Sequence, residues 1–307
     1  MATAREYTDD WESLDQVLAD WETALRAANK APRTIKSYLE SARRIARFLT
    51  DQGLPDRIDD ITAPVIQSYF VRELDRGMSA STVARDYRHL RQLFRYAVRQ
   101  ELVDANPLDK VEVPKVPEIP VPVVTDEDLR KLLDACKGRT FPDRRDTAIV
   151  RFLLDTGARL SELLGLSLDD VDLDRGLALV LGKGRRPRDL PFGDRTAVAI
   201  KAYLKVRRAH SKAASDKLWI GDRGDFKESG VQQMLKRRCD EAGMERIHPH
   251  QLRHTFAHRW MSAGGNETDL MRLAGWQSRQ MVERYGKSQA DARAKDAHRR
   301  MKLGDQL

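Results

Sequence analysis

Residues 250–260 read HQLRHTFAHRW, residues 273–276 read LAGW, and a tyrosine follows at position 285. Upstream, residues 156–162 read TGARLSE and residues 182–184 read GKG. From these segments we single out the guanidinium groups of Arg159 and Arg253, the ammonium of Lys183, the imidazole of His250, the indole N–H of Trp276 and the phenol of Tyr285. Guanidinium groups form paired hydrogen bonds with phosphate oxygens, and a phenol is a nucleophile once it loses its proton. The set is suited to binding a phosphodiester and attacking its phosphorus without a metal ion.

The composition indicates a folded protein with a polyanionic partner. The chain has 307 residues, 41% of them hydrophobic and 33% charged, which suggests two domains of ordinary size. Its net charge of +8 favours association with nucleic acid. Cys136 and Cys239 are too few for a zinc knuckle or a disulfide framework, so we expect both to be buried as small apolar residues. Neither a signal segment nor a membrane-spanning run is present, which favours a cytoplasmic protein that enters no membrane.

A proline-rich segment divides the sequence. Its prolines are Pro107, Pro114, Pro117, Pro120 and Pro122. Because proline lacks the backbone N–H and disfavours helix in the residue before it, the segment is predicted to be extended. We therefore predict a linker over residues 107–124, between a first domain of residues 1–106 and a second of residues 125–307.

The predicted elements are mostly helices. In the first domain apolar residues recur at helical spacing, which predicts a compact bundle with helices over residues 14–27, 35–49, 63–74 and 83–98. In the second domain a capping box at residues 125–128 starts a helix, and further helices are predicted over residues 144–155, 194–210, 228–242, 249–263, 267–274 and 279–285. Residues 177–181 and 188–192 flank a glycine-containing turn and predict a β-hairpin. The fold class is mainly α, with a helical bundle followed by a mostly helical domain that contains a small antiparallel β-sheet.

Two helices of the first domain carry arginines away from their apolar stripes. These arginines are Arg43, Arg44 and Arg47 on one helix and Arg85, Arg88, Arg91, Arg95 and Arg99 on the other. Few acidic residues accompany them, so we predict that these faces contact the DNA backbone or a groove. A solvated charged face is the alternative.

The candidate site residues each have an ordinary alternative when taken alone. His250 and Arg253 share a helical face, since they lie three residues apart. Lys183 lies at a glycine-flanked turn, where a solvated lysine is common, and the segment is not a nucleotide P-loop, so we infer no ATP. Tyr285 sits in a polar segment between Arg284 and Lys287, whereas a lone tyrosine more often packs in a half-buried position. The occurrence of all these residues in one sequence is what favours a functional site over the ordinary alternatives.

The five segments, in this order, resemble the tyrosine recombinase (phage integrase) family, and the helical first domain is similar to that family's core-binding, SAM-like domain. The resemblance implies that Tyr285 attacks a scissile phosphate and forms a 3′-phosphotyrosyl link, while Arg159 and Arg253 bind the non-bridging oxygens. It implies Lys183 as general acid and gives His250 a part in proton transfer or phosphate orientation. Trp276 stands where the family usually has histidine, which leaves a hydrogen-bond donor that cannot titrate. Glu162 and His254 would support the site.

The resemblance also implies the partners. They are double-stranded DNA that carries a specific recombination site and, on synapsed DNA, three further copies of the chain. No cofactor is implied, because the covalent link conserves the bond energy. Whether a protein activator takes part stays open. The sequence begins almost directly with the bundle helices, which favours a simple Xer-like or transposon-type recombinase. The tail after Tyr285 is either a helix that docks on a neighbouring copy or a frayed cationic terminus.

Three other functions remain open from the residues alone. His250, His254 and His258 recur at four-residue spacing, a geometry that zinc sites use, although Arg253 would lie beside the cation. The chain is also compatible with an accessory DNA-binding protein of the same fold without strand exchange. A type IB topoisomerase, which relaxes DNA with a similar residue set, is the third alternative.

Overall fold

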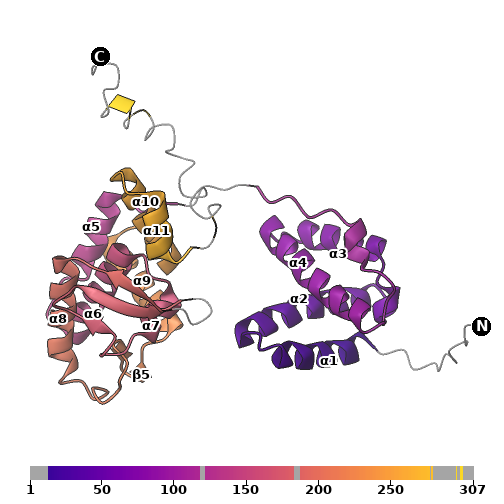
Figure 1. Ribbon diagram of the computed structural model, residues 1–307, viewed down its shortest axis with the longest axis horizontal. Coiled ribbons are helices and arrows are strands. Elements are labelled where there is room, and N and C mark those ends of the chain that lie inside the picture. Colours follow the sequence, from indigo (N-terminus) through magenta and orange to yellow (C-terminus); the bar gives the residue numbers. More distant parts are fainter. Residues whose placement is uncertain are drawn as a thin grey trace, which may run out of the picture. The chain divides into compact units, whose positions relative to one another are not determined.

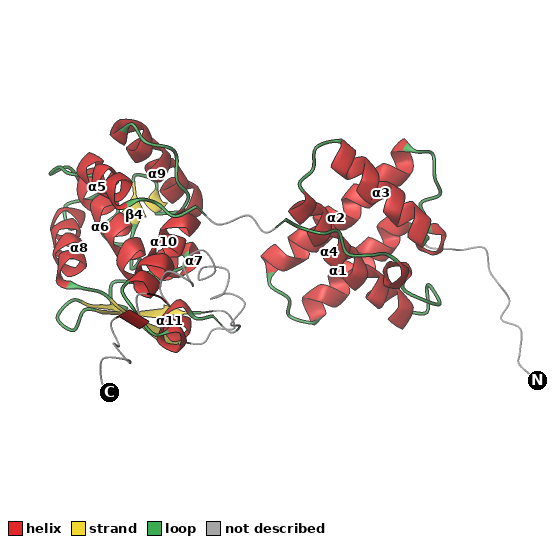
Figure 2. Ribbon diagram, turned by 90° about the horizontal axis from the view of Figure 1, so that it is seen from above, coloured by secondary structure: helices red, strands yellow, loops and turns green. Residues whose placement is uncertain are grey.

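The computed structural model describes residues 13–117, 122–182 and 187–276, together with the single positions 278, 295, 298 and 299. The chain divides into two compact units, Met1–Glu118 and Ile119–Leu307 (Figures 1 and 2). This division lies inside the proline-rich segment. Within the described ranges, none of the helices combines the length and the apolar character needed to cross a bilayer.

The first unit is a bundle built on four described α-helices. They are α1 (Leu14–Ala27), α2 (Pro32–Asp51), α3 (Ala63–Asp75) and α4 (Ala80–Arg99). The apolar stripe of each helix faces the shared core, where Val17, Ile45, Ile66 and Leu90 have no exposed surface. Helix α1 has its predicted bounds and α3 is one residue longer than predicted, whereas α2 and α4 begin three residues earlier, because Pro32 and Ser79 provide their starts. The predicted bundle is confirmed.

A buried carboxylate ties three helices of this bundle together. Asp86 of α4 accepts hydrogen bonds from Ser41 Oγ at 2.8 Å, from Arg44 Nε at 2.8 Å and from Tyr69 Oη at 2.9 Å. Burial by itself raises the pKa of Asp86, but the hydrogen bonds from Arg44, Ser41 and Tyr69 outweigh it and hold that pKa below its usual range. Asp86 is therefore an ionised structural residue.

The first part of the predicted linker belongs to the first unit. Pro107–Lys110 forms the 3₁₀ helix η2, in which Leu108 is fully buried, and Val111 is also buried in the bundle core. A proline is compatible with the first position of such a turn, and Asn106 caps it by accepting from the Leu108 N–H at 3.0 Å. The expectation of an extended chain over residues 107–110 was therefore wrong. Proline content alone does not reveal that a leucine beside it fills a core position.

The second unit combines helices with two small sheets. Its described helices are α5 (Asp126–Ala135), α6 (Phe141–Thr156), α7 (Leu160–Gly165), α8 (Asp194–Arg207), α9 (Glu228–Ala242), α10 (Pro249–Ser262) and α11 (Glu267–Ala274). Its described strands are β1 (Val171–Asp172), β2 (Leu177–Leu181), β3 (Pro187–Pro191), β4 (Ile220–Gly221) and β5 (Gly224–Asp225). The order β1-β2-β3 is antiparallel throughout, and β4 pairs with β5. The mainly α fold with a small antiparallel sheet is confirmed.

Several element boundaries differ from the sequence prediction. The hairpin is confirmed, with Leu179 opposite Asp189 in the register of β2 and β3. Helix α6 begins one turn before Arg144, because Thr140 and Asp143 form a capping box. Strands β1, β4 and β5 were not predicted, since two residues carry no periodicity. The helix predicted over residues 279–285 lies outside the described residues.

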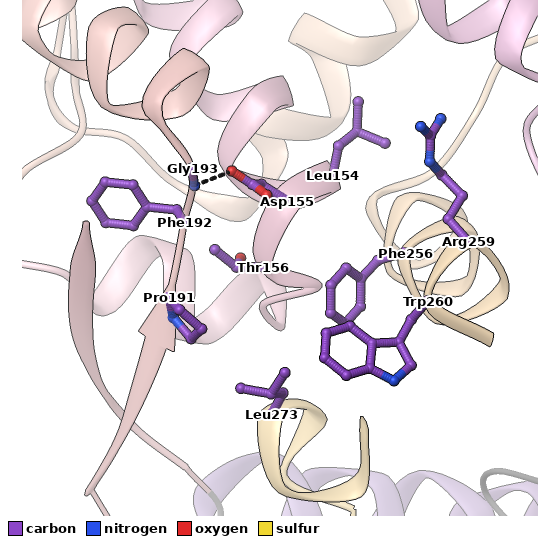
Figure 3. A pocket seen from close by; sticks show the side chains of 10 residues that line it. All are labelled: Leu154, Asp155, Thr156, Pro191, Phe192, Gly193, Phe256, Arg259, Trp260 and Leu273. Atoms are coloured by element: carbon purple, nitrogen blue, oxygen red, sulfur yellow. Dashed lines mark hydrogen bonds between the residues drawn. The ribbon is translucent and has the colours of Figure 1, made fainter. Parts of the chain in front are cut away.

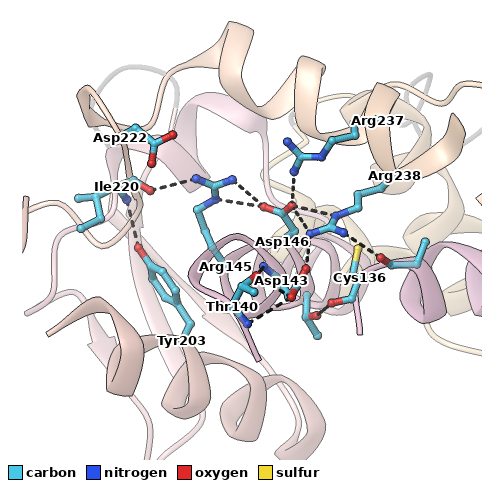
Figure 4. A network of polar contacts seen from close by, with 12 residues as sticks. Cys136, Thr140, Asp143, Arg145, Asp146, Tyr203, Ile220, Asp222, Arg237 and Arg238 are labelled. Atoms are coloured by element: carbon cyan, nitrogen blue, oxygen red, sulfur yellow. Dashed lines mark hydrogen bonds and ion pairs between the residues drawn. The ribbon is translucent and has the colours of Figure 1, made fainter. Parts of the chain in front are cut away.

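A second buried carboxylate joins α6 to α9 (Figure 4). Asp146 accepts from Arg145 Nη2 at 2.8 Å, from Arg237 Nη2 at 2.7 Å and from Arg238 Nε at 2.9 Å. Arg238 also donates to Asp143 at 2.9 Å and to the Ala135 carbonyl of α5 at 2.9 Å. This network joins α5, α6 and α9. Cys136 and Cys239 are buried and free, as expected.

Candidate functional site

Three arginines meet at the carboxyl end of α11. Arg253 Nη2 donates to the Ala274 carbonyl at 2.6 Å, and Arg159 Nη2 donates to the Gly275 carbonyl at 2.9 Å. Arg188 Nη1 donates to the Leu273 carbonyl. The last carbonyls of a helix have no intrahelical partner and carry partial negative charge, so they attract cations. The end of α11 thus gathers guanidinium groups from three separate elements.

Arg253 of α10 is the most deeply fixed of the three. Only 3% of the residue is exposed, and Nη1 donates to the Gly157 carbonyl at 2.6 Å. Its guanidinium lies over the Trp276 ring, with 5.3 Å between its central carbon and the ring centroid. The two terminal nitrogens therefore bridge the end of α6 and the end of α11.

Arg159 is held by the short helix that it precedes. It is the N-cap of α7, and its backbone N–H donates to Glu162 Oε2 at 2.8 Å while its Nη1 donates to Oε1 at 2.8 Å. Burial by itself raises the pKa of the Glu162 carboxyl, but the Arg159 contacts and the Arg188 guanidinium outweigh it and hold that pKa below its usual range. Glu162 is thus a buried carboxylate that orients Arg159.

Arg188 is a site residue that the sequence analysis did not identify. It lies on β3, and its Nη2 donates to Glu162 Oε2 at 2.7 Å. A signal was present in the hairpin, because alternation along β3 places Arg188 on the same face as Leu190, which is fully buried. An arginine at a core-facing strand position needs a buried partner, and that requirement points to a site.

Gly275 allows this close approach of arginines. Its φ of +61° lies in the left-handed region that ends a helix, and a Cβ there would lie 3.0 Å from Arg188 Nε and 3.3 Å from Arg159 Nη1. Either guanidinium would have to move to make room for a methyl group.

We expect Gly275→Ala to slow DNA cleavage by about 10- to 100-fold, because small displacements of groups that bind the reacting centre are costly. Gly243 is a matched control, since it ends α9 at φ +62° and a Cβ there meets nothing within 4 Å. Both variants should lose about 1 kcal/mol of stability from the left-handed backbone. Single-turnover cleavage rates, compared at equal folded fraction, test this, and equal rates for the two variants would contradict it.

The histidines predicted for the site lie on α10. His250 is exposed, and His254, one turn later, is 4% exposed. Their rings meet edge to face at a centroid distance of 4.3 Å, and His258 is half-buried. Across the residues that the structure describes, no group of three or more histidine, cysteine, aspartate or glutamate side chains is arranged to hold a metal ion. His250 and His254 thus lie on the same helix as Arg253, α10.

The structure brings together part of the predicted set. Arg159, Glu162, Arg253 and Trp276 meet around the α11 end, and Trp276 is 6% exposed in the small core between α10 and α11. Lys183 and Tyr285 lie outside the described residues. Their roles remain predictions from the sequence.

The arginines predicted to bind DNA differ in their surroundings. Those that are exposed are Arg43 and Arg47 on α2 and Arg88, Arg95 and Arg99 on α4. Arg44 is instead held by Asp86, with 19% of its side chain exposed, and Arg91 pairs with Asp109 at 2.8 Å. Arg85 lies 3.8 Å from Asp86. Helical spacing placed all eight off the apolar stripe but did not show which of them are engaged by acids.

A hollow of about 430 Å³ lies beside the site (Figure 3). Phe256 and Trp260 of α10 and Leu273 of α11 point into it. On another side Asp155 accepts from the Gly193 N–H at 2.8 Å. The hollow is lined mostly by apolar side chains, and none of the three arginines at the α11 end lines it.

Family models match most of the chain. Residues 122–291 match the phage integrase family, and residues 17–104 match the phage integrase N-terminal SAM-like domain. The tyrosine recombinase XerC of Oceanobacillus iheyensis is 30% identical over 264 residues, covering 84% of this chain and 86% of that protein. The tyrosine recombinase XerC of Thermodesulfovibrio yellowstonii is 31% identical over 259 residues, covering 82% of this chain and 84% of that protein.

Solved structures share the fold. The Tn1549 transposon integrase in complex with a circular intermediate DNA is similar with a TM-score of 0.73 at 20% identity, covering 89% of this chain and 94% of that one. A lambda integrase dimer bound to a core site is similar with a TM-score of 0.71 at 18% identity, covering 89% of this chain and 95% of that one.

Proposed function

The chain belongs to the phage integrase family of site-specific tyrosine recombinases, and from that premise we propose that it breaks and rejoins double-stranded DNA through a 3′-phosphotyrosyl link to Tyr285. The observation that carries the proposal is the meeting of Arg159 and Arg253 at consecutive carbonyls of one helix end. Two guanidinium groups so close together suit one phosphate with two non-bridging oxygens. A solvated surface role does not account for Arg253, which is 3% exposed.

The proposed reaction needs no metal ion, and it replaces the phosphodiester bond that it breaks with a phosphotyrosyl ester bond. The Tyr285 phenol transfers its proton to His250 or to water as its oxygen attacks the scissile phosphorus. The bond from phosphorus to the 5′-oxygen then breaks, and Lys183 protonates this leaving group. Arg159 and Arg253 neutralise the charge that grows on the non-bridging oxygens, and Trp276 and His250 donate hydrogen bonds there. Attack by the 5′-hydroxyl of a partner strand reverses these steps and rejoins the DNA.

A suicide substrate, nicked next to the cleavage point, tests the function. Loss of the short fragment traps the covalent intermediate, so a recombinase accumulates a protein–DNA adduct. An accessory binding protein forms no adduct. Relaxation of a supercoiled plasmid that lacks a recombination site separates the remaining alternative, because a type IB topoisomerase turns over there and a recombinase does not.

We propose that the exposed arginines of α2 and α4 bind DNA phosphates. They share helix faces turned away from the bundle core, and those faces carry few free acids. Phosphate contacts of this kind make affinity fall with salt, since each releases bound counterions.

We expect Arg88→Gln with Arg95→Gln to reduce the slope of log affinity against log salt by about 2, one for each lost phosphate contact. Arg26→Gln is the matched control, because Arg26 lies on α1, is 71% exposed and pairs with Glu22. Titration of DNA binding at several salt concentrations gives the slopes. A double variant with the slope of the unchanged protein would show that α4 does not contact phosphate.

The finer organisation is also a proposal. We infer that the chain between Val111 and Val124, the remainder of the linker predicted over residues 107–124, connects a core-binding domain to a catalytic domain, and that four copies synapse two duplexes. The tail after Tyr285 then docks on a neighbouring copy, and the hollow lined by Phe256, Trp260 and Leu273 offers it an apolar surface. Apolar residues in the tail suit such a surface, namely Ala292, Ala294, Ala297 and Met301. A cytoplasmic location and a protein activator stay predictions.

A further inference from the structure

We propose that Arg188 is a positioning residue for DNA cleavage, which supplies Glu162 with a second counter-charge and so allows Arg159 to turn from this carboxylate to the scissile phosphate. The inference rests on the proposed function, because it concerns the same cleavage step. It assigns a role to a strand residue that lies outside the predicted catalytic set.

The two guanidinium groups divide the oxygens of one carboxylate. Arg159 Nη1 donates to Glu162 Oε1 at 2.8 Å, whereas Arg188 Nη2 donates to Oε2 at 2.7 Å. Oε2 also accepts the backbone N–H of Arg159 at 2.8 Å. The Arg159 side chain can therefore leave Oε1 without disturbing either contact at Oε2.

Exposure separates the roles of the two arginines. The Arg159 side chain is 34% exposed and the Arg188 side chain is 14% exposed, while the Glu162 side chain between them is 2% exposed. Arg159 is thus open to a ligand and Arg188 is mostly covered. A buried carboxylate that loses one of its cations is stable only if another remains, because an unpaired buried charge is strongly unfavourable.

The Arg188 guanidinium is also anchored independently of Glu162. Its Nη1 donates to the Leu273 carbonyl, so it is fixed to the end of α11 when Arg159 moves. Its Nε has no hydrogen-bond partner among the described residues and would lie 3.0 Å from a Cβ at Gly275. Arg188 therefore remains in place as the counter-charge of Glu162. Its contact with the Leu273 carbonyl also holds the end of α11, which Trp276 follows, at the site.

The test compares Arg188→Met, which keeps the length and removes the charge, with Arg188→Lys, which keeps the charge. Single-turnover cleavage of the suicide substrate at saturating protein gives the rate, and binding of uncleaved DNA gives the affinity. We expect Arg188→Met to cleave about 100-fold more slowly, as loss of a buried charge partner implies, with affinity within about threefold of the unchanged protein. Arg188→Lys should stay within about tenfold of the unchanged rate.

Arg207→Met is the matched control for loss of a buried arginine. Arg207 is 3% exposed and donates to backbone carbonyls, at 3.1 Å to Leu218 and at 2.6 Å to Lys217. This variant should lose thermal stability yet cleave at the unchanged rate per folded molecule. A cleavage defect equal to that of Arg188→Met would reduce the role of Arg188 to general stability and overturn the proposal.

Adding Glu162→Gln gives the sharpest outcome. If Arg188 acts by balancing the carboxylate, then neutralising the carboxylate removes the need for it, so the double variant should be faster than Arg188→Met and match Glu162→Gln alone. A double variant slower than both single variants would overturn the proposal. If Arg188→Met does not fold, Arg188→Gln, which also removes the charge but keeps a hydrogen-bond donor, takes its place in the same comparison. Failure of the unchanged protein to form any adduct would instead refute the proposed function.

Discussion

Tyr285→Phe is expected to abolish the covalent adduct with the suicide substrate and to leave DNA binding unchanged. The substitution removes the oxygen that would form the ester with phosphorus and keeps the aromatic ring. In the proposed reaction the remaining site groups stabilise charge but do not replace the nucleophile. The rate of adduct formation should therefore fall by more than about a thousandfold. Denaturing gels measure the adduct, and mobility shifts measure binding.

A second tyrosine provides the control for this variant. Tyr203 is fully buried, and its hydroxyl donates to the Leu218 carbonyl at 3.0 Å and accepts from the Ile220 N–H at 3.1 Å. Tyr203→Phe leaves the buried Ile220 N–H without its partner, while the Leu218 carbonyl still accepts from Arg207 Nε at 3.1 Å. The variant should lower stability, yet it should still form the adduct. An adduct from Tyr285→Phe would show that another residue is the nucleophile.

Arg253→Lys is expected to slow cleavage by about 100- to 1000-fold, as for the removal of a main donor to the transition state. The two terminal nitrogens of Arg253 donate to the Gly157 and Ala274 carbonyls, each at 2.6 Å, and the guanidinium lies over the Trp276 ring. An ammonium keeps the charge but has no planar fork, so it cannot bridge the two helix ends and face a phosphate in a fixed direction. Single-turnover rates at saturating DNA separate this effect from weaker binding.

Arg238→Lys is the control for loss of a buried fork. Arg238 is 6% exposed and holds Asp146 and Asp143, both at 2.9 Å, within the network that joins α6 and α9. Its replacement should lower stability and leave the chemical step unchanged per folded molecule. If Arg253→Lys behaved in the same way, Arg253 would be a structural residue and not a phosphate ligand.

Much of the fold was predictable because its signals are local. Helix α11 was predicted with the bounds that the structure has, since Asn266 caps its start and Gly275 ends it. The β2–β3 hairpin followed from an apolar run before a glycine turn. The fully buried position of Leu108 could not be read from the sequence, because its proline-rich surroundings signal an extended chain and only tertiary packing fills the core around it.

The sequence by itself determined which chemical groups the protein has and on which elements most of them lie, because helical and strand periodicity and capping act over a few residues. The tertiary structure alone decided that Arg159 donates to the Gly275 carbonyl, 116 residues away, and that Arg188 completes the cluster from a strand 85 residues before Leu273. It also decided that Arg44 is engaged by Asp86 while Arg88 is exposed. Hydrogen bonds and burial depend on distances in space, and no local pattern in a single chain encodes which distant carbonyl or carboxylate will satisfy a guanidinium.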